Sequence, residues 1–177
     1  MKKYILSFLF FVLLLVPIQL DAKDNLSMVW GDPQDYIYAD LLGSKKKAVV
    51  WFYQISNKTG EKQTAYINIT LVTDTGKQYD DTWSPLVEVK LLGKEHEQYE
   101  DCLTMGGDFY NGVTKKGMAV FPNVDPGSTE IMIYVSGLAD SYWRENNLVQ
   151  SVYKITYKRS NNKWTKLKHG WETQKVQ

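Results

Sequence analysis

The chain has 177 residues, a length that suits one domain, and a formal net charge of +1. Removal of residues 1–22 would take away Lys2, Lys3 and Asp21, which leaves 19 basic and 19 acidic side chains. A neutral domain exerts no long-range attraction on nucleic acid or on anionic lipid, so neither is an expected partner of the domain as a whole. The single cysteine, Cys102, excludes an internal disulfide, so an exported domain must be stabilised by its core.

Residues 1–22 have the pattern of a signal peptide. Two lysines precede an apolar run over residues 4–18, Pro17 interrupts that run, and Ala22 offers a small residue for cleavage. We therefore expect residues 23–177 to form a single exported domain, either periplasmic or extracellular. The alternative is an uncleaved N-terminal membrane anchor, although the apolar run is shorter than the roughly 20 residues of a spanning helix.

Apolar and polar residues alternate over much of the remaining chain, which is typical of β-strands. Residues 64–73 are the clearest example, because every second residue from Ala65 to Leu71 is apolar. Turns rich in Gly and Asn separate these segments, since both residues adopt positive φ at low cost. The pattern predicts strands over 36–42, 48–56, 64–73, 78–80, 117–121, 130–135, 149–159 and 163–171.

The middle of the chain breaks this alternation. Ser84-Pro85 is a helix start, and Leu86, Val89 and Leu92 follow at helical spacing, so one amphipathic helix is expected over about 84–99. A mainly β chain with about seven short strands and one inserted helix predicts an immunoglobulin-like antiparallel β-sandwich. A small closed barrel is the alternative architecture.

Several segments resemble a group of uncharacterised exported bacterial proteins. They are residues 51–60 (WFYQISNKTG), 71–77 (LVTDTGK), 115–122 (KKGMAVFP) and 134–138 (YVSGL). The layout over about 48–170 is similar to telokin-like, immunoglobulin-type domains of bacterial surface and periplasmic proteins. The resemblance implies a sandwich fold and an envelope location. It implies no functional residue, because these motifs form turns and strands.

The sequence contains no recognisable catalytic or metal-binding pattern. The mature chain has one Cys and two His, which lie far apart, whereas zinc sites need clusters of these residues. Asp74, Asp80 and Asp81 form the densest acidic group but lack the register of an EF-hand loop. Neither a Gly-x-Ser-x-Gly motif nor a phosphate-binding loop occurs. We therefore predict no catalytic residue, no metal and no cofactor; an enzyme that uses Asp80, Asp81 and the helix region is the minor alternative.

Aromatic residues near the C-terminus are the one feature with functional potential. Flat Trp and Tyr faces stack on sugars, and β-sandwiches often serve as carbohydrate-binding modules. The candidate ligand-binding residues are Trp143, Trp164 and Trp171, with Tyr142 and Tyr153 beside them in sequence. Trp164 follows the Asn161-Asn162 turn and is expected to be partly exposed, although such rings also serve to pack a core.

The sequence favours a non-enzymatic domain of the cell envelope with a binding or structural role. Its partner would be an unidentified protein or an envelope polymer, bound through a sheet edge or end loops. The alternative is a carbohydrate-binding module that uses the C-terminal aromatics.

Overall fold

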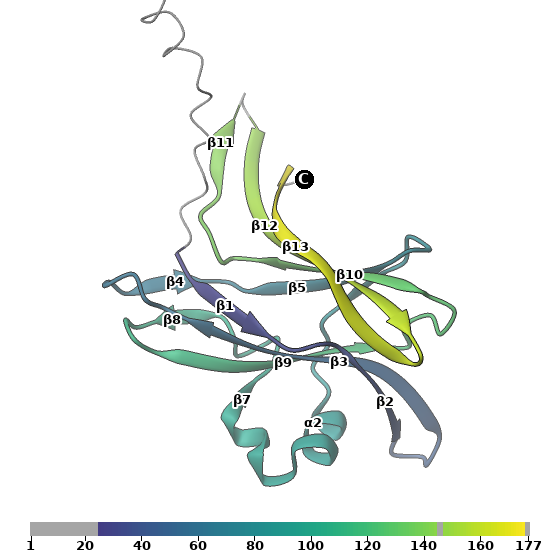
Figure 1. Cartoon of the computed structure of the whole chain (residues 1–177). Helices are drawn as coiled ribbons and strands as arrows, with labels where there is room; N and C mark the ends of the chain where they lie inside the picture. The colour runs from purple at the N-terminus through teal and green to yellow at the C-terminus, as the bar shows by residue number, and fades with distance from the viewer. Residues whose placement is uncertain (1–24, 145–146, 176–177) are drawn as a thin grey trace, which may run out of the picture.

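The structure is a computed structural model that describes residues 25–144 and 147–175. The predicted signal peptide, residues 1–22, lies outside the described residues. Within them the protein is mainly β, with thirteen strands and one short α-helix, and two large sheets pack face to face (Figure 1). The prediction of a mainly β protein with one short inserted helix is confirmed, and the stacked sheets are consistent with a sandwich.

The first sheet is centred on the long strand β3 (Lys45–Ser56), which pairs with β9 (Thr114–Pro122) along one side. Two shorter strands share its other side: β1 (Ser27–Trp30) pairs with the end of β3, and β2 (Gln34–Ala39) pairs with its beginning. Strand β7 (Tyr99–Glu100) extends the sheet as a parallel neighbour of β9. The β2–β3 hairpin therefore protrudes at one end of this sheet (Figure 1).

The second sheet has the order β6 (Gln78–Asp80), β5 (Asn68–Thr73), β10 (Glu130–Ser136), β12 (Asn147–Ser160). Strand β13 (Lys163–Lys175) adds to it as a further neighbour of β12, and β11 (Tyr142–Arg144) pairs with the start of β12. Positive φ angles at Asn161 and Asn162 form the predicted tight turn between β12 and β13. A separate two-stranded ladder joins β4 (Gln63–Ala65) to β8 (Gly107–Phe109).

The main core lies between the two large sheets. Trp51 on β3 is fully buried there, and its indole N–H donates to Gly31 O at 2.9 Å and to Tyr157 Oη at 3.2 Å. Because Gly31 lies in the β1–β2 connection and Tyr157 lies on β12, this one side chain ties β3 to both. Inward-facing residues of both sheets complete the core, including Ile55, Leu71, Phe121, Ile133 and Ile155.

A second, smaller core lies between the first sheet and the helix α2 (Pro85–Leu92). Val87 is fully buried against Val50 and Val120, so the second face of β3 and β9 is covered as well as the first. Both faces of these two strands therefore carry apolar residues. No helix in the described ranges has the length and apolarity needed to span a bilayer.

The prediction of one helix over 84–99 is wrong in its extent. The α-helix ends at Leu92, because Gly93 adopts a positive φ of 56°, and a 3-10 helix follows over Gly93–Gln98. Val89 is 51% exposed rather than on the buried face, and Leu91 and Leu92 pack beside Val87 instead.

Each predicted strand is present; the strand over 78–80 has the predicted boundaries as β6, and the boundaries of the others are shifted. The expected strand over 64–73 is divided into β4 and β5, and four further short strands, β1, β7, β8 and β11, have no counterpart in the prediction. The structure thus has thirteen strands rather than about seven, because several of its strands have only two to four residues.

Candidate functional site

Trp164 does not offer an exposed face. Its ring is 3% exposed, and the guanidinium of Arg159, its cross-strand partner on β12, stacks over it at 4.4 Å from the ring centroid. The indole N–H donates to Asp35 Oδ1 on β2 at 3.3 Å. The expectation that Trp164 is partly exposed is therefore wrong, because the tip of the β12–β13 hairpin folds against β2.

Trp143 lies on β11, where its backbone pairs with that of Leu148 on β12. Its side chain lies outside the described part of the structure. The three predicted tryptophans therefore do not form one platform that the structure describes, and Trp171 is the one whose ring is both described and accessible.

Trp171 belongs to a cluster of rings that also includes Trp30, Tyr153 and His169, here called the aromatic cluster. Trp171 contacts Tyr153 edge-to-face at 5.1 Å and 82°, and Trp30 contacts Tyr153 at 5.4 Å and 64°. These are the favoured geometries of paired aromatic rings, so each ring is held in place by its neighbours. Trp171 is 36% exposed, whereas Tyr153 and Trp30 are half-buried.

Polar groups lie within the aromatic cluster. Tyr153 Oη hydrogen bonds to His169 Nδ1, and the His169 ring itself contacts Trp30 at 5.4 Å. The ammonium of Lys166 lies 5.5 Å from the Trp30 centroid, so one face of that ring is already covered by a cation. Of the two tryptophans in the cluster, Trp171 is thus the more open to a ligand, and the exposed His169 lies in the same cluster.

A pocket of about 190 Å³ opens beside these rings, lined by Trp30, Tyr153 and Trp171 together with Leu26, Met28 and Leu138. Pockets for drug-sized ligands are larger, about 300–1,000 Å³. This pocket therefore suits one ring or one unit of a ligand whose remainder stays outside, rather than a whole enclosed molecule.

The outward face of the second sheet carries a second concavity, of about 330 Å³, here called the polar face. Residues of β5, β6, β10, β12 and β13 line it, on the sheet whose strands β12 and β13 bend away from the rest (Figure 1). One aromatic residue, Tyr134, contributes to it, and the Lys154 ammonium lies 5.3 Å from that ring. Its remaining polar lining consists of neutral amides and hydroxyls: Asn68, Thr70, Gln78, Ser136, Gln150 and Gln174.

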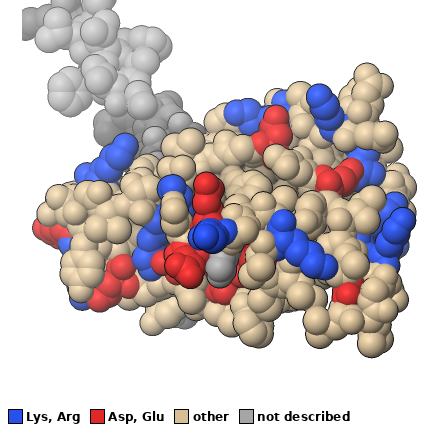
Figure 2. Space-filling view, turned by 90° about the horizontal axis from the view of Figure 1, so that it is seen from below, with Lys and Arg blue, Asp and Glu red and all other residues tan. Residues whose placement is uncertain are grey.

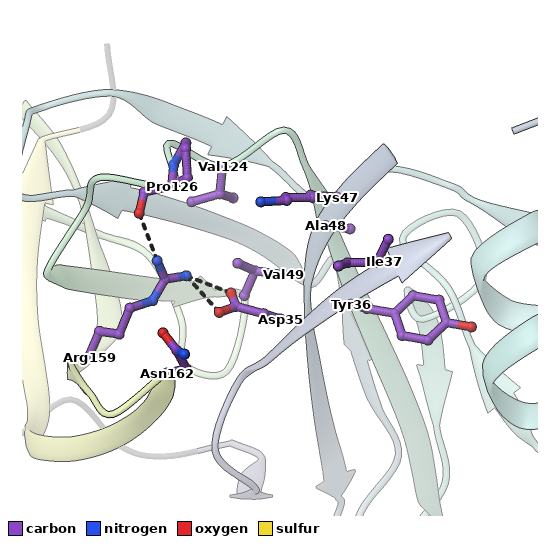
Figure 3. Close-up of a pocket in the computed structure, with 10 residues that line it drawn as sticks. All are labelled: Asp35, Tyr36, Ile37, Lys47, Ala48, Val49, Val124, Pro126, Arg159 and Asn162. Atoms are coloured by element: carbon purple, nitrogen blue, oxygen red, sulfur yellow. Dashed lines mark hydrogen bonds and ion pairs between the residues drawn. The ribbon is translucent and has the colours of Figure 1, made fainter. Parts of the chain in front are cut away.

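A third concavity, of about 370 Å³, lies between β2 and the β12–β13 hairpin (Figure 3). An ion pair crosses this concavity: Arg159 Nη2 contacts both Asp35 carboxylate oxygens at 2.7 and 2.8 Å, and Arg159 Nη1 donates to Pro126 O at 2.9 Å. This charge-assisted contact links Arg159 of β12 to Asp35 of β2. We therefore interpret this pocket as a structural junction that holds the hairpin on β2.

The structure does not bring the three acids of the candidate calcium group together. Asp74 accepts hydrogen bonds from Thr129, and these bonds lower its pKa. Asp80 accepts from Thr70 Oγ1, whereas Asp81 accepts from Val120 N at 2.8 Å. Across the described residues, no group of three or more His, Cys, Asp or Glu side chains is placed to hold a metal ion.

Asp81 and Cys102 have perturbed acidities. Burial raises the pKa of Asp81 to about 7, against the opposing effect of the Val120 hydrogen bond, and the negative charge of Asp101 raises it further. Burial likewise raises the pKa of Cys102 to about 11, so its thiol stays protonated at neutral pH. A nucleophilic cysteine needs the opposite shift.

The sequence indicated Trp171 and Tyr153 but missed Trp30 and His169 as members of the cluster. Trp30 ends β1, a four-residue strand too short to produce a recognisable alternation, and it reaches Tyr153 only through the packing of the two sheets. The pairing of Tyr153 with Trp171 was not predictable either. An unbroken ladder from the Asn161-Asn162 turn would place Tyr153 opposite Gly170, and the β-bulge between Thr156 and Tyr157 shifts the register by one residue.

Comparisons of the chain with models of protein families, with curated proteins and with solved structures found no match.

Proposed function

We propose that this chain is an exported, non-enzymatic binding domain of the cell envelope, with an immunoglobulin-like sandwich, and that it binds a neutral carbohydrate at the aromatic cluster. The observation that carries the proposal is the exposed Trp171 ring, fixed edge-to-face on Tyr153 beside a small open pocket. Export is inferred from the pattern of residues 1–22.

A carbohydrate fits the chemistry of this surface. The C–H faces of a pyranose ring pack on a flat indole, and a ring that is already immobile loses little conformational entropy when a ligand binds. The Tyr153 hydroxyl and the His169 ring supply polar groups within the same cluster. The mature domain carries equal numbers of acidic and basic residues, which favours an uncharged ligand over a polyanion.

Binding without catalysis is supported by the chemistry of the reactive side chains. The raised pKa of Cys102 keeps its thiol protonated. Asp81, the acid whose pKa lies nearest to neutrality, is half-buried and bonded to the backbone of β9, and it lines none of the three pockets described above.

The test is retention of the purified protein on insoluble polymers: chitin, glucan, mannan and peptidoglycan. We expect the wild type to be retained by at least one of them, and Trp171→Ala to lose at least about tenfold in affinity. Trp83→Ala is the matched control, since Trp83 is 55% exposed and lies outside the aromatic cluster. It should bind like the wild type.

The same assay locates the site. Tyr134→Ala alters the polar face and leaves the aromatic cluster intact. Retention lost with Tyr134→Ala but kept with Trp171→Ala would move the sugar to the polar face and contradict the proposed site. Retention on none of the polymers would contradict carbohydrate binding itself.

A further inference from the structure

The tip of the β2–β3 hairpin, residues 40–44, holds the two most exposed large apolar side chains of the described structure. Leu41 is 85% exposed and Leu42 is 92% exposed. Both lie in the turn that connects β2 to β3, at the end of the hairpin that protrudes from the first sheet (Figure 1). Adjacent leucines at a protruding tip cannot pack on their own domain, so their apolar surface faces solvent or a partner.

The turn itself is rigidly built, so the leucines are held outward. Asp40 Oδ1 accepts hydrogen bonds from Leu42 N at 2.9 Å and from Ser44 N at 2.8 Å. Two backbone bonds close the same turn, from Asp40 N to Ser44 O and from Gly43 N to Asp40 O. Gly43 has a φ of 81°, a conformation that glycine adopts without strain. Neither leucine side chain is needed for this network.

Cations surround the tip. Lys45, Lys46 and Lys47 are all exposed at the start of β3, and Lys90 of α2 donates to Ala39 O at 2.7 Å. The one acid within residues 40–44, Asp40, is occupied by the turn and lies 3.9 Å from Lys46 Nζ. Figure 2 shows several basic side chains, with acidic ones among them, toward the end of this face where the hairpin lies, and a mixed cluster of acidic and basic side chains nearer its centre. The tip is therefore locally cationic although the domain is neutral overall.

Two leucines form the end of the hairpin, and three lysines follow within a few residues. Tyr38 lies at the level of Lys46 and Tyr36 lies further from the tip, opposite Ala48, with the centroids of the two stacked rings 6.5 Å apart. Apolar residues at the tip, cations at the level of phosphates and Tyr at the boundary match the layers of an anionic lipid surface. A protein hot spot is instead a buried centre with a surrounding rim, and no rim encloses these leucines.

We propose that the hairpin tip is a peripheral membrane-binding site that inserts Leu41 and Leu42 into a bilayer rich in anionic lipid. This site is separate from the aromatic cluster. Trp30 pairs with Tyr53, eight residues along β3 from Lys45 and roughly 26 Å away at the rise of a strand. A protein bound by its tip would therefore keep Trp171 away from the lipid.

The test is co-sedimentation with vesicles of phosphatidylcholine plus phosphatidylglycerol, against vesicles of phosphatidylcholine alone. All variants are prepared identically and their N-termini are read by mass spectrometry, so any retained N-terminal segment contributes equally to each. The double variant Leu41→Ser/Leu42→Ser should lower the partition coefficient at least about tenfold. Lys45→Gln and Lys47→Gln should each lower it about fivefold on anionic vesicles, and added salt should do the same.

The matched control is Leu103→Ser/Leu167→Ser, which removes two exposed leucines elsewhere, 71% and 54% exposed. This control should bind vesicles like the wild type, and far-ultraviolet circular dichroism should show all variants folded. Equal binding by the tip variant and the wild type, or no binding by either, would overturn the proposal. A wild-type dimer that the tip variant loses, without vesicle binding, would assign the leucines to a protein contact and overturn it as well.

Discussion

Asp81 gives the stability of this protein an unusual dependence on pH. Its pKa rises from an ordinary value of 3.8 to about 7 in the folded state, mainly through burial. A raised pKa means that the folded protein binds the proton more tightly than the unfolded chain does. The stabilisation is therefore complete below about pH 4 and is lost as the pH rises through about 7.

The size of this effect follows from the shift. About three pKa units at 1.36 kcal/mol each amount to at most about 4 kcal/mol of unfolding free energy. Asp81 is half-buried rather than sealed, so solvent screening brings the expected value nearer about 2 kcal/mol. Asp81→Asn keeps an oxygen for the Val120 N–H and removes the titration. It should be more stable than the wild type at about pH 8, and this advantage should vanish at about pH 4.

The assay is urea unfolding of both proteins across that pH range. Asp74→Asn is a control whose effect on stability should have the opposite pH dependence. Hydrogen bonds from Thr129 lower the pKa of Asp74. The stabilisation by the Asp74 carboxylate is therefore present at neutral pH and lost in acid. The difference in unfolding free energy between Asp81→Asn and the wild type should grow with pH. A difference that stays constant across the range would refute the reasoning.

Two core substitutions make further predictions. Asn57 is fully buried and donates to Glu61 O at 2.7 Å and Phe109 O at 2.6 Å. Asn57→Ala should therefore lower the free energy of unfolding, measured with denaturant, by about 3 kcal/mol. A decrease below about 1 kcal/mol would contradict the importance of these hydrogen bonds. A Cβ on Gly117 would lie 2.2 Å from a ring carbon of Tyr53, so Gly117→Ala should lower stability by about 1–3 kcal/mol, and an unchanged melting temperature would show that the ring moves freely.

Much of the fold was predictable because local signals and burial agree. Strand β10 alternates buried Ile131, Ile133 and Val135 with half-buried residues, as its sequence pattern indicates. Asn57, which directly follows the predicted strand over 48–56, has a role that no local pattern contains. Its side chain is fully buried and bridges to Phe109, fifty-two residues away, which only the tertiary fold brings near.

The candidate site was less predictable, because a ring's exposure depends on packing between distant elements. Trp164 and Trp171 lie on the same strand in similar sequence surroundings. Trp164 is covered by Arg159 and by Asp35 of β2, whereas Trp171 lies beyond that contact and stays open. The exposed leucines of the hairpin tip were not predictable either. The predicted strand over 36–42 included Leu41 and Leu42, whereas the observed strand β2 ends at Ala39 and both leucines lie in the turn.

The most direct test of the account is the dissociation constant for the polymer that retains the wild type, compared between the wild type, Trp171→Ala and Trp83→Ala. The account predicts at least about tenfold weaker binding for Trp171→Ala and unchanged binding for Trp83→Ala. Equal dissociation constants for the wild type and a folded Trp171→Ala would contradict the claim that the aromatic cluster binds carbohydrate.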